Sequence, residues 1–385
     1  MIKALTAHTA EIDDIEGAVA EICGQLDLER NLLRHSAGIL TCYPEFIDSG
    51  VVKALCDRLP FPVVGATTLA TAVRGECGQL ILGLMVLTSD DATFGTATTK
   101  SLPGDMDGAL SDAFADASAA LGQAPGMVFS FLPLIYHYAG DQYIASLDRI
   151  SGGLPHFGTI CIGQKTDYSD LYTIYNGEVC RDEMAMLLIG GDIDPTFFVV
   201  SVATAKAQEQ TAIITSSQGN ILKEVNNMPL AQYLETLNLA KDGKIIEGVN
   251  AIPFVIDYND GTQPVARAMF TITPEGYGVC GGVMPVGLAL AIGSMDRDDV
   301  ITTTAETIEA ALATKKNSAM LMFSCIGRNL ALGFDTMAEM DCVISHMGNK
   351  VPFLMAYSGG EVGPMAHENG YYNRFHNNTF VACII

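Results

Sequence analysis

The chain has 385 residues, 49% of them hydrophobic, which is enough apolar side chain for one large or two medium-sized cores and too much for an intrinsically disordered protein. Its formal net charge of -23 comes from 44 acidic and 21 basic residues, and no stretch concentrates lysine and arginine. Nucleic acid and anionic membrane surfaces are therefore excluded as expected partners.

The N-terminus carries charges at Lys3, Glu11 and Asp13 and has no apolar run long enough for a signal-peptide core, so we expect a cytoplasmic protein. Two uncharged stretches, 117–140 and 276–295, have the length of a membrane span. Prolines and glycines divide them into short β-like runs, and we interpret both as buried strands. The ten cysteines are scattered without a Cys-x-x-Cys pair, which predicts reduced, mostly buried thiols and disfavours structural zinc.

In chain order, one pattern is repeated three times: an apolar strand, a helix, a Pro-containing apolar strand and then hairpin strands. The first copy has a strand at 37–42, a helix near 49–59, a strand at 61–65 and a closing strand at 80–87. The second has a strand at 127–131, a helix near 141–150, a strand at 154–158, a turn at Asn176-Gly177 and a strand at 184–189. The third has a strand at 319–325, a helix near 336–347, and strands at 351–357 and 379–385.

The region between the second and third copies has a different character. It predicts a hairpin over 211–225, a helix from 229 to about 239, strands at 253–258, 264–273 and 283–292, and a helix near 298–314. Amphipathic stretches at 14–26 and 107–121 predict covering helices. Together these elements predict an α/β fold with mixed β-sheets, built from repeated strand-helix-strand-hairpin units, in two domains over 1–204 and 205–385.

One glycine motif, Gly276-Tyr277-Gly278-Val279-Cys280-Gly281, matches the dinucleotide-binding spelling. That spelling binds a pyrophosphate only where it turns a strand into a helix. Here the flanking residues are β-like and Pro285 follows, so we expect no nucleotide site.

Polar residues follow two strands of the third copy. Arg328 comes after the strand that ends at Cys325, and Glu361 follows the strand that ends near Tyr357. Loops at the carboxyl ends of strands build the sites of open α/β sheets, so we expect Arg328 and Glu361 to meet there, joined by Arg374, His376 and Asn377. The same pattern is also compatible with a plain Arg-Glu ion pair of structural value.

These residues carry a family resemblance. The segments Ser324-Cys325-Ile326-Gly327-Arg328, 357–364 and Phe375-His376-Asn377-Asn378-Thr379 resemble successive signatures of the FIST C-terminal domain. Residues 62–68 and the hairpin at 175–179 resemble the FIST N-terminal domain. The likeness covers nearly the whole chain and is strongest at the C-terminal motifs.

The resemblance implies a bacterial or archaeal signal-transduction input module that binds a small ligand, such as an amino acid. It also implies a signalling partner such as a histidine kinase, a cyclic-dinucleotide enzyme or a chemoreceptor, because the chain has no output segment of its own. We expect the ligand to be bound by residues of the C-terminal motifs: Cys325, Arg328, Tyr357, Gly360, Glu361, His376 and Asn377.

Two alternatives remain open. A subset of FIST proteins senses nitric oxide through haem, and seven histidines are available as axial ligands, although no Cys-x-x-Cys-His motif supports covalent attachment. The other is an enzyme in which Cys325 attacks an acyl group, with His376 as base and Glu361 or Asn377 orienting it.

Overall fold

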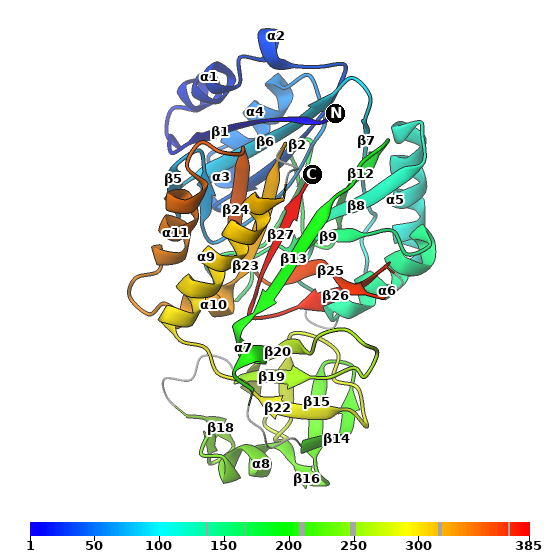
Figure 1. The fold of residues 1–385 in the computed structure, drawn as a ribbon, viewed down its shortest axis with the longest axis vertical. Coiled ribbons are helices and arrows are strands. Elements are labelled where there is room, and N and C mark those ends of the chain that lie inside the picture. Colours follow the sequence, from blue (N-terminus) through cyan, green and yellow to red (C-terminus); the bar gives the residue numbers. More distant parts are fainter. Residues whose placement is uncertain (136–137, 166, 208–211, 247–251, 315–317, 369) are drawn as a thin grey trace.

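Three six-stranded sheets and one seven-stranded sheet organise the chain in the computed structural model (Figure 1). The seven-stranded sheet is built from residues 212–292 and lies at one end of the long axis; we call it the inserted sheet. The structure describes residues 1–385 except 136–137, 166, 208–211, 247–251, 315–317 and 369. The fold is thus mixed α/β, as the sequence predicts.

Three successive units of the chain build the six-stranded sheets. The helices and strands follow one another in the same order in each unit. Each unit has an edge strand, a covering helix, a strand, a second helix, a strand parallel to the previous one, a hairpin and a last strand. The first unit comprises β1 (Lys3–Thr9), α1 (Ile15–Leu26), α2 (Leu28–Asn31), β2 (His35–Cys42), α3 (Glu45–Asp48), α4 (Val51–Arg58), β3 (Val63–Thr67), β4 (Thr71–Val73), β5 (Glu76–Gly78) and β6 (Leu82–Ser89).

The second and third units repeat this order. The second comprises β7 (Thr93–Thr98), α5 (Met106–Leu121), β8 (Pro125–Leu132), α6 (Gly140–Ser151), β9 (His156–Ile160), β10 (Thr173–Tyr175), β11 (Glu178–Cys180) and β12 (Ala185–Gly190). The third comprises β13 (Thr196–Ser201), α7 (Val202–Ala205), α9 (Arg297–Ala313), β23 (Met320–Cys325), α10 (Ile326–Ala331), α11 (Ala338–Met347), β24 (Phe353–Ser358), β25 (Glu361–His367), β26 (Gly370–His376) and β27 (Thr379–Ile384).

The inserted sheet interrupts the third unit between α7 and α9. Its elements are β14 (Ala212–Gln218), β15 (Ile221–Val225), β16 (Met228–Pro229), α8 (Leu230–Thr236), β19 (Ile252–Ile256), β20 (Val265–Ile272), β21 (Gly278–Cys280) and β22 (Ala289–Ile292), with a small ladder of β17 (Ala240–Lys241) and β18 (Lys244–Ile245) beside it. It has an apolar core of its own, in which Leu230 and Leu234 of α8 pack against Phe254 of β19.

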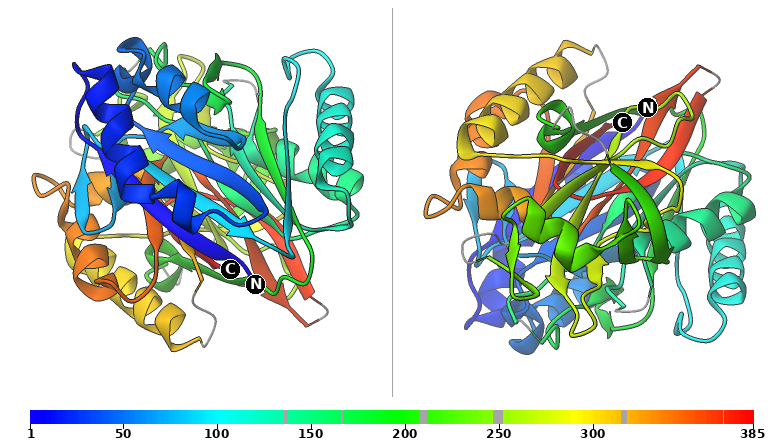
Figure 2. Two further views of the ribbon diagram at one scale, coloured as in Figure 1. Left: turned by 90° about the horizontal axis from the view of Figure 1, so that it is seen from above. Right: turned by 90° about the horizontal axis from the view of Figure 1, so that it is seen from below.

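Each unit gives its hairpin to the sheet of another unit. The hairpin β4–β5 of the first unit pairs with β24 of the third, and β10–β11 of the second pairs with β3 of the first. The hairpin β25–β26 of the third unit pairs with β9 of the second. This cyclic exchange ties the three units into a closed ring, and Figure 2 shows their helices on the outside of that ring.

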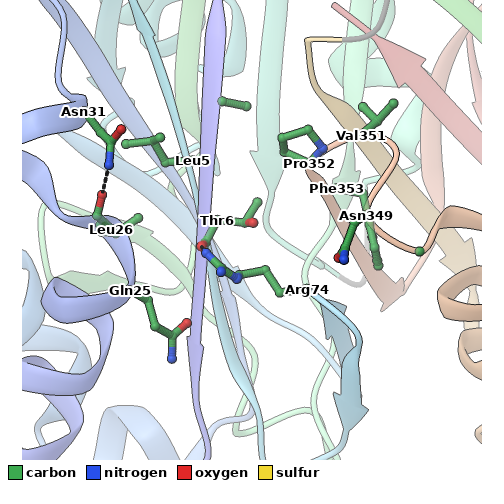
Figure 3. Close-up of a pocket in the computed structure, with 12 residues that line it drawn as sticks. Leu5, Thr6, Gln25, Leu26, Asn31, Arg74, Asn349, Val351, Pro352 and Phe353 are labelled. Atoms are coloured by element: carbon green, nitrogen blue, oxygen red, sulfur yellow. Dashed lines mark hydrogen bonds between the residues drawn. The ribbon is translucent and has the colours of Figure 1, made fainter.

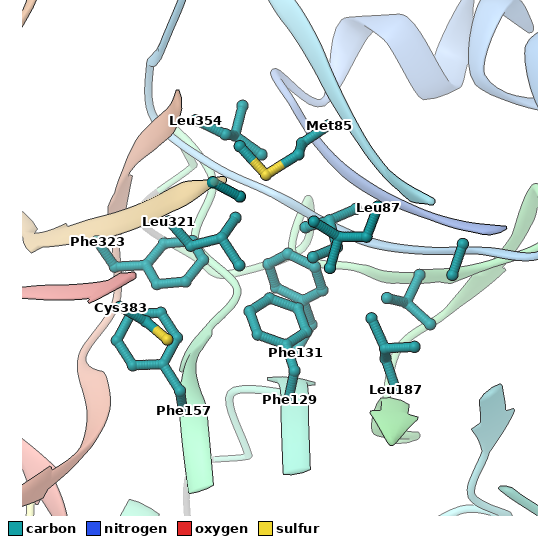
Figure 4. Close-up of a cluster of buried hydrophobic side chains, with 14 of the residues drawn as sticks. Met85, Leu87, Phe129, Phe131, Phe157, Leu187, Leu321, Phe323, Leu354 and Cys383 are labelled. Carbon is teal, nitrogen blue, oxygen red and sulfur yellow. The ribbon is translucent and has the colours of Figure 1, made fainter. Parts of the chain in front are cut away.

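The inner faces of the three sheets share one apolar core (Figure 4). Its centre is aromatic: the ring centroids of Phe157 and Phe323, from the second and third units, lie 5.6 Å apart, and those of Phe129 and Phe131 lie 5.1 Å apart. Met85 of the first unit completes the centre. Helices cover the outer faces: α1 and α4, α5 and α6, and α9 and α11.

Helices α1, α5 and α9 begin with the same local signal. Asp14 and Asp105 accept hydrogen bonds from the third backbone N–H after them, and Asp296 does so in a capping box with Asp299. A cap of this kind satisfies one of the unpaired N–H groups of the first turn and stabilises a helix by about 1 kcal/mol. The start of the first long helix in each unit is therefore encoded locally.

The three copies read from the sequence correspond to β2–β6, β8–β12 and β23–β27, which confirms the repeat. The sequence analysis missed the edge strands β1, β7 and β13, and it did not anticipate the hairpin exchange. The strand predicted at 283–292 is shorter, because only Ala289–Ile292 forms β22. The division at residue 204 stays a prediction.

Neither uncharged stretch of membrane length forms a long helix. Residues 117–140 contain the end of α5 and strand β8, and residues 276–295 contain β21 and β22. In the described part of the chain, no helix has the length and hydropathy needed to span a membrane.

Candidate functional site

A cavity of about 330 Å³ lies where the inserted sheet meets the second unit; we call it the junction cavity. Helix α6 contributes Asp141 and Asp148 to its wall, and β26 contributes Asn373, Arg374 and Phe375. The rest of the wall belongs to the loops of the inserted sheet, with Tyr258, Val283 and Pro285. The cavity therefore exists only while the inserted sheet is docked on the ring.

A buried arginine fastens the inserted sheet beside this cavity. The guanidinium of Arg267 on β20 is fully buried and donates to Asp141 Oδ1 at 2.7 Å and to the backbone oxygen of Phe375 at 2.6 Å. The second carboxylate oxygen of Asp141 accepts from the backbone N–H of Val283 at 2.8 Å. Because a buried cation is costly without partners, these bonds hold β20, α6 and β26 in one arrangement.

Arg374 brings a second guanidinium to the wall of the cavity. It is paired with Asp260 and lies over the ring of Tyr258, 4.4 Å from the centroid. Its Nε is buried and has no hydrogen-bond partner among the described residues. A buried donor without a partner is costly, so the interactions of this side chain with the described residues leave part of its hydrogen-bonding capacity unused at the wall of the cavity.

Asp148 is the acidic counterpart of Arg374 in the cavity. Its Oδ1 accepts from Asn373 Nδ2 at 2.6 Å, and Asn373 Oδ1 in turn accepts from the backbone N–H of His156 at 2.9 Å. Burial raises the pKa of Asp148, while the bond from Asn373 opposes that rise. The junction cavity thus offers a guanidinium and a half-buried carboxyl group to one ligand.

The seven residues predicted to bind the ligand lie deeper than this cavity. Cys325, Arg328, Tyr357, Gly360, Glu361, His376 and Asn377 are all buried, and none belongs to the wall of the junction cavity as described. The structure brings His376 and Asn377 close to it, because they directly follow Phe375. Gly360 packs against Phe375 and Asn377.

The expected pairing of Arg328 with Glu361 is wrong. Arg328 pairs with Glu339 of α11, with Nη2 and Nε at 2.8 and 3.0 Å from Oε1, and both side chains are fully buried. Its Nη2 also donates to the Thr304 hydroxyl and to the backbone oxygen of Val300. Helix α11 packs against α9 and shares an apolar cluster with β23, which places the carboxylate of Glu339 within reach of the guanidinium.

Glu361 is satisfied by hydroxyl groups instead. Its two carboxyl oxygens accept from Ser358 Oγ at 2.9 Å and from Thr379 Oγ1 at 2.8 Å. Burial raises its pKa to about 8, although both hydroxyl donors oppose that rise. A buried carboxyl group with a raised pKa, whose two oxygens already accept hydrogen bonds, is a poor partner for an ammonium group.

Two family models match this sequence. The FIST N domain matches residues 36–228 and the FIST C domain matches residues 229–364. The chain belongs to the FIST family. FIST domains are sensory modules of signal transduction that bind small molecules.

Other comparisons of the FIST chain are less informative. No curated protein matches it. Among solved structures, the crystal structure of a cyanuric acid hydrolase from A. caulinodans aligns with 100% of this chain and 99% of its own, at 12% sequence identity and a TM-score of 0.38. A similarity at that level supports no conclusion about this protein.

In the FIST chain, the thiol of Cys325 is poorly placed for nucleophilic attack. The residue is 1% exposed, and burial together with the neighbouring Glu361 carboxyl raises the pKa of its thiol. A nucleophilic cysteine needs a thiolate that a substrate can reach. His376 is buried as well, and its Nε2 contacts the backbone oxygen of Gly363 rather than the thiol. These features weigh against the acyl-transfer alternative.

The residues of the FIST chain also do not fit a haem in the junction cavity. No histidine, cysteine or methionine is among its described lining residues, and the hydroxyl of Tyr258 is bonded to Arg267 at 2.9 Å. His156 and His376 are buried and are not among the lining residues, and burial lowers the pKa of each to about 3. In the described part of the chain, no group of three or more potential ligands is arranged for a metal ion.

Apart from Arg374 and Phe375, the residues that line the junction cavity were not predicted from the sequence. Asp141 and Tyr258 of the wall, and Arg267 beside it, come from three distant segments, and no local motif connects them. One signal was present: Arg267 is a charge inside the apolar strand Val265–Ile272, and such a residue needs a buried partner.

Proposed function

We propose that this FIST protein is a sensory input protein whose small-molecule ligand binds in the junction cavity. The observation that carries the proposal is that Arg374 and Asp148, side chains of opposite charge, line one cavity of about 330 Å³. Sites for small molecules are concave and combine apolar walls with a few oriented polar groups. Ile144, Val283 and Phe375 supply apolar wall here.

The chemistry of the wall favours a small ligand with charges of both signs, such as an amino acid. A guanidinium is a planar donor that suits a carboxylate, and Asp148 can accept a hydrogen bond from an ammonium group. Of the predicted residues, Gly360, His376 and Asn377 enter the proposal as neighbours of Phe375 that respond to the ligand through the end of β26. Cys325, Arg328, Tyr357 and Glu361 lie deeper and have no part in binding the ligand in this proposal.

The position of the cavity suits a sensor. A ligand there contacts the inserted sheet and the ring at once, so its binding energy acts on the relative position of the two bodies. We propose that this change is read by a signalling partner in the cytoplasm, such as a histidine kinase, a cyclic-dinucleotide enzyme or a chemoreceptor. The FIST domains, which function in signalling, motivate that partner.

The ligand proposal is tested with the substitution Arg374→Lys. We expect one or more of the twenty amino acids to raise the midpoint of thermal unfolding of the wild-type protein, and Arg374→Lys to weaken that ligand at least tenfold in calorimetry, because a point charge replaces the fork and its Nε donor. The matched control is Arg149→Lys, since Arg149 lies on α6 with its exposed partner Asp107 and does not line the cavity. Unchanged affinity in a folded Arg374→Lys protein would refute the site.

A spectrum separates this proposal from the haem alternative. We expect protein purified from haem-sufficient cells to show no Soret band, because the described wall of the cavity lacks a histidine, cysteine or methionine. A Soret band that disappears on substitution of one histidine would contradict the proposal and favour a haem sensor.

A further inference from the structure

A second cavity, of about 320 Å³, lies between the first and third units (Figure 3). It is bounded by β1, by Gln25 and Asn31 from α1 and α2, by Arg74 in the turn between β4 and β5, and by the segment 348–353 that leads into β24. Strand β1 is the end strand of its sheet and pairs only with β6. The cavity therefore lies against a free strand edge.

Two side chains already occupy part of this edge. The amide of Gln25 accepts from the backbone N–H of His8 at 3.0 Å and donates to its backbone oxygen at 2.8 Å, as a neighbouring strand would. The guanidinium of Arg74 donates to the backbone oxygen of Thr6 at 2.8 Å. In an antiparallel ladder the N–H and C=O of one residue face the same side, and alternate residues face opposite sides. His8, Thr6 and Ala4 thus present their backbone groups away from β6.

What remains of the edge is unpaired. The N–H of Thr6 and both backbone groups of Ala4 face the cavity, and no hydrogen bond to them occurs among the described residues. Both residues are only 6% exposed. Backbone groups that are nearly buried and lack a partner are costly, and a row of them along a strand is a template for another strand.

The corresponding edge of the second unit has an equivalent cap. There the hydroxyl of Tyr175 donates to the backbone oxygen of Thr96 on β7, which is the counterpart of the bond from Arg74 to Thr6. The edge at β1 is thus capped at the equivalent point but leaves a cavity beyond it.

We propose that this cavity receives an extended segment of a partner protein, which adds to the sheet as a strand beside β1. Ala4 and Thr6 are separated by about 7 Å along the strand, which a stretch of three extended residues covers. Donor and acceptor groups at that spacing match a polypeptide backbone, and peptide recognition by strand addition uses such an edge. The inference rests on the proposed partner protein and does not involve the junction cavity.

The substitution Thr6→Pro tests the edge without breaking the sheet. Proline removes the N–H that faces the cavity, and proline is tolerated on an edge strand where its missing N–H is not part of the ladder. Thr6→Val is the matched control, because it keeps the N–H and removes only the hydroxyl. Random linear nonapeptides displayed on phage are selected on the wild-type protein, and the best synthetic peptide is titrated against all three proteins by fluorescence anisotropy.

We expect the peptide to bind the wild-type and Thr6→Val proteins equally and Thr6→Pro about tenfold more weakly, since a peptide carbonyl loses its donor. A peptide carrying N-methyl groups at alternate residues should lose affinity in the same way, and the amide of Thr6 should gain protection from hydrogen exchange when the peptide binds. The N-methylated peptide and the hydrogen-exchange measurement use the wild-type protein, so they still test the inference if Thr6→Pro does not fold.

Three results would overturn the inference: no peptide enriched on the wild-type protein, equal affinity for Thr6→Pro, or dimerisation of this chain through β1. A peptide displaced by one of the twenty amino acids would also overturn it, because the cavity would then be a small-molecule site. Arg374→Lys should leave peptide binding unchanged, so the failure of either proposal is recognisable without the other.

Discussion

Replacing Glu339 with alanine is expected to lower the free energy of unfolding by about 3–5 kcal/mol. The reason is that Arg328, which is fully buried and cannot lose its charge, keeps the Thr304 hydroxyl and the backbone oxygen of Val300 but loses its only carboxylate partner among the described residues. Urea unfolding followed by circular dichroism measures the change.

The matched control is Asp335→Ala, which breaks the exposed pair of Arg297 with Asp335 in the same unit. That change should cost less than about 1 kcal/mol, since solvent screens the pair. The double substitution of Arg328 by methionine and Glu339 by leucine should recover most of the stability, because it removes both charges together. Equal losses for Glu339→Ala and Asp335→Ala would show that the buried pair does not hold α11 on the sheet.

The contribution of Glu361 to stability should fall as the pH rises from about 5 to about 8, in opposition to the contribution of the buried histidines His156 and His376, which rises over the same range. Its pKa in the folded protein is raised to about 8, above its ordinary value of 4.5, so the folded state holds a proton that the unfolded state has released. Stability falls with pH wherever the folded state binds more protons, and the expected loss from Glu361 over this range is about 3 kcal/mol.

Glu361→Gln isolates this effect. The amide keeps the shape of the protonated acid and does not titrate, so the difference in unfolding free energy between the two proteins should shift in favour of the variant by that amount from pH 5 to pH 8. His156 and His376, whose lowered pKa values stabilise the fold above about pH 6.5, titrate in both proteins and cancel in the comparison. A difference that stays constant with pH would mean that Glu361 is ionised in the folded protein.

The sequence predicts the local elements of this fold well. Apolar runs bounded by proline and glycine locate β2, β8 and β23 with their following helices, and the Asn176-Gly177 turn between β10 and β11 has both residues at positive φ, as such a hairpin requires. Hydrophobic periodicity and turn residues are properties of short stretches of sequence, so a single sequence is sufficient to find them.

The residues of a strand or helix do not indicate which distant segment of the chain it will contact. Nothing in Thr71–Val73 indicates pairing with β24 rather than β3, and the acidic residues Glu339 and Asp341 of α11 do not reveal which one faces Arg328. The wall of the junction cavity could not be predicted for the same reason, since it comes from α6, β26 and the inserted sheet. Only Arg374, as a polar residue near the carboxyl ends of the strands, and Phe375, as part of a family motif, were named beforehand.

The exchange of hairpins has a consequence for synthesis on the ribosome. Val73 of β4 finds its neighbour Leu354 only after about 280 more residues have been added, which takes roughly 15–60 s at ~5–20 residues per second. Until then the hairpin has no sheet to join, and its apolar residues and strand edges are exposed to other nascent chains. Pairing over such separations is also intrinsically slow. A protein of this architecture is expected to depend on chaperones that hold the first two units open until the third arrives.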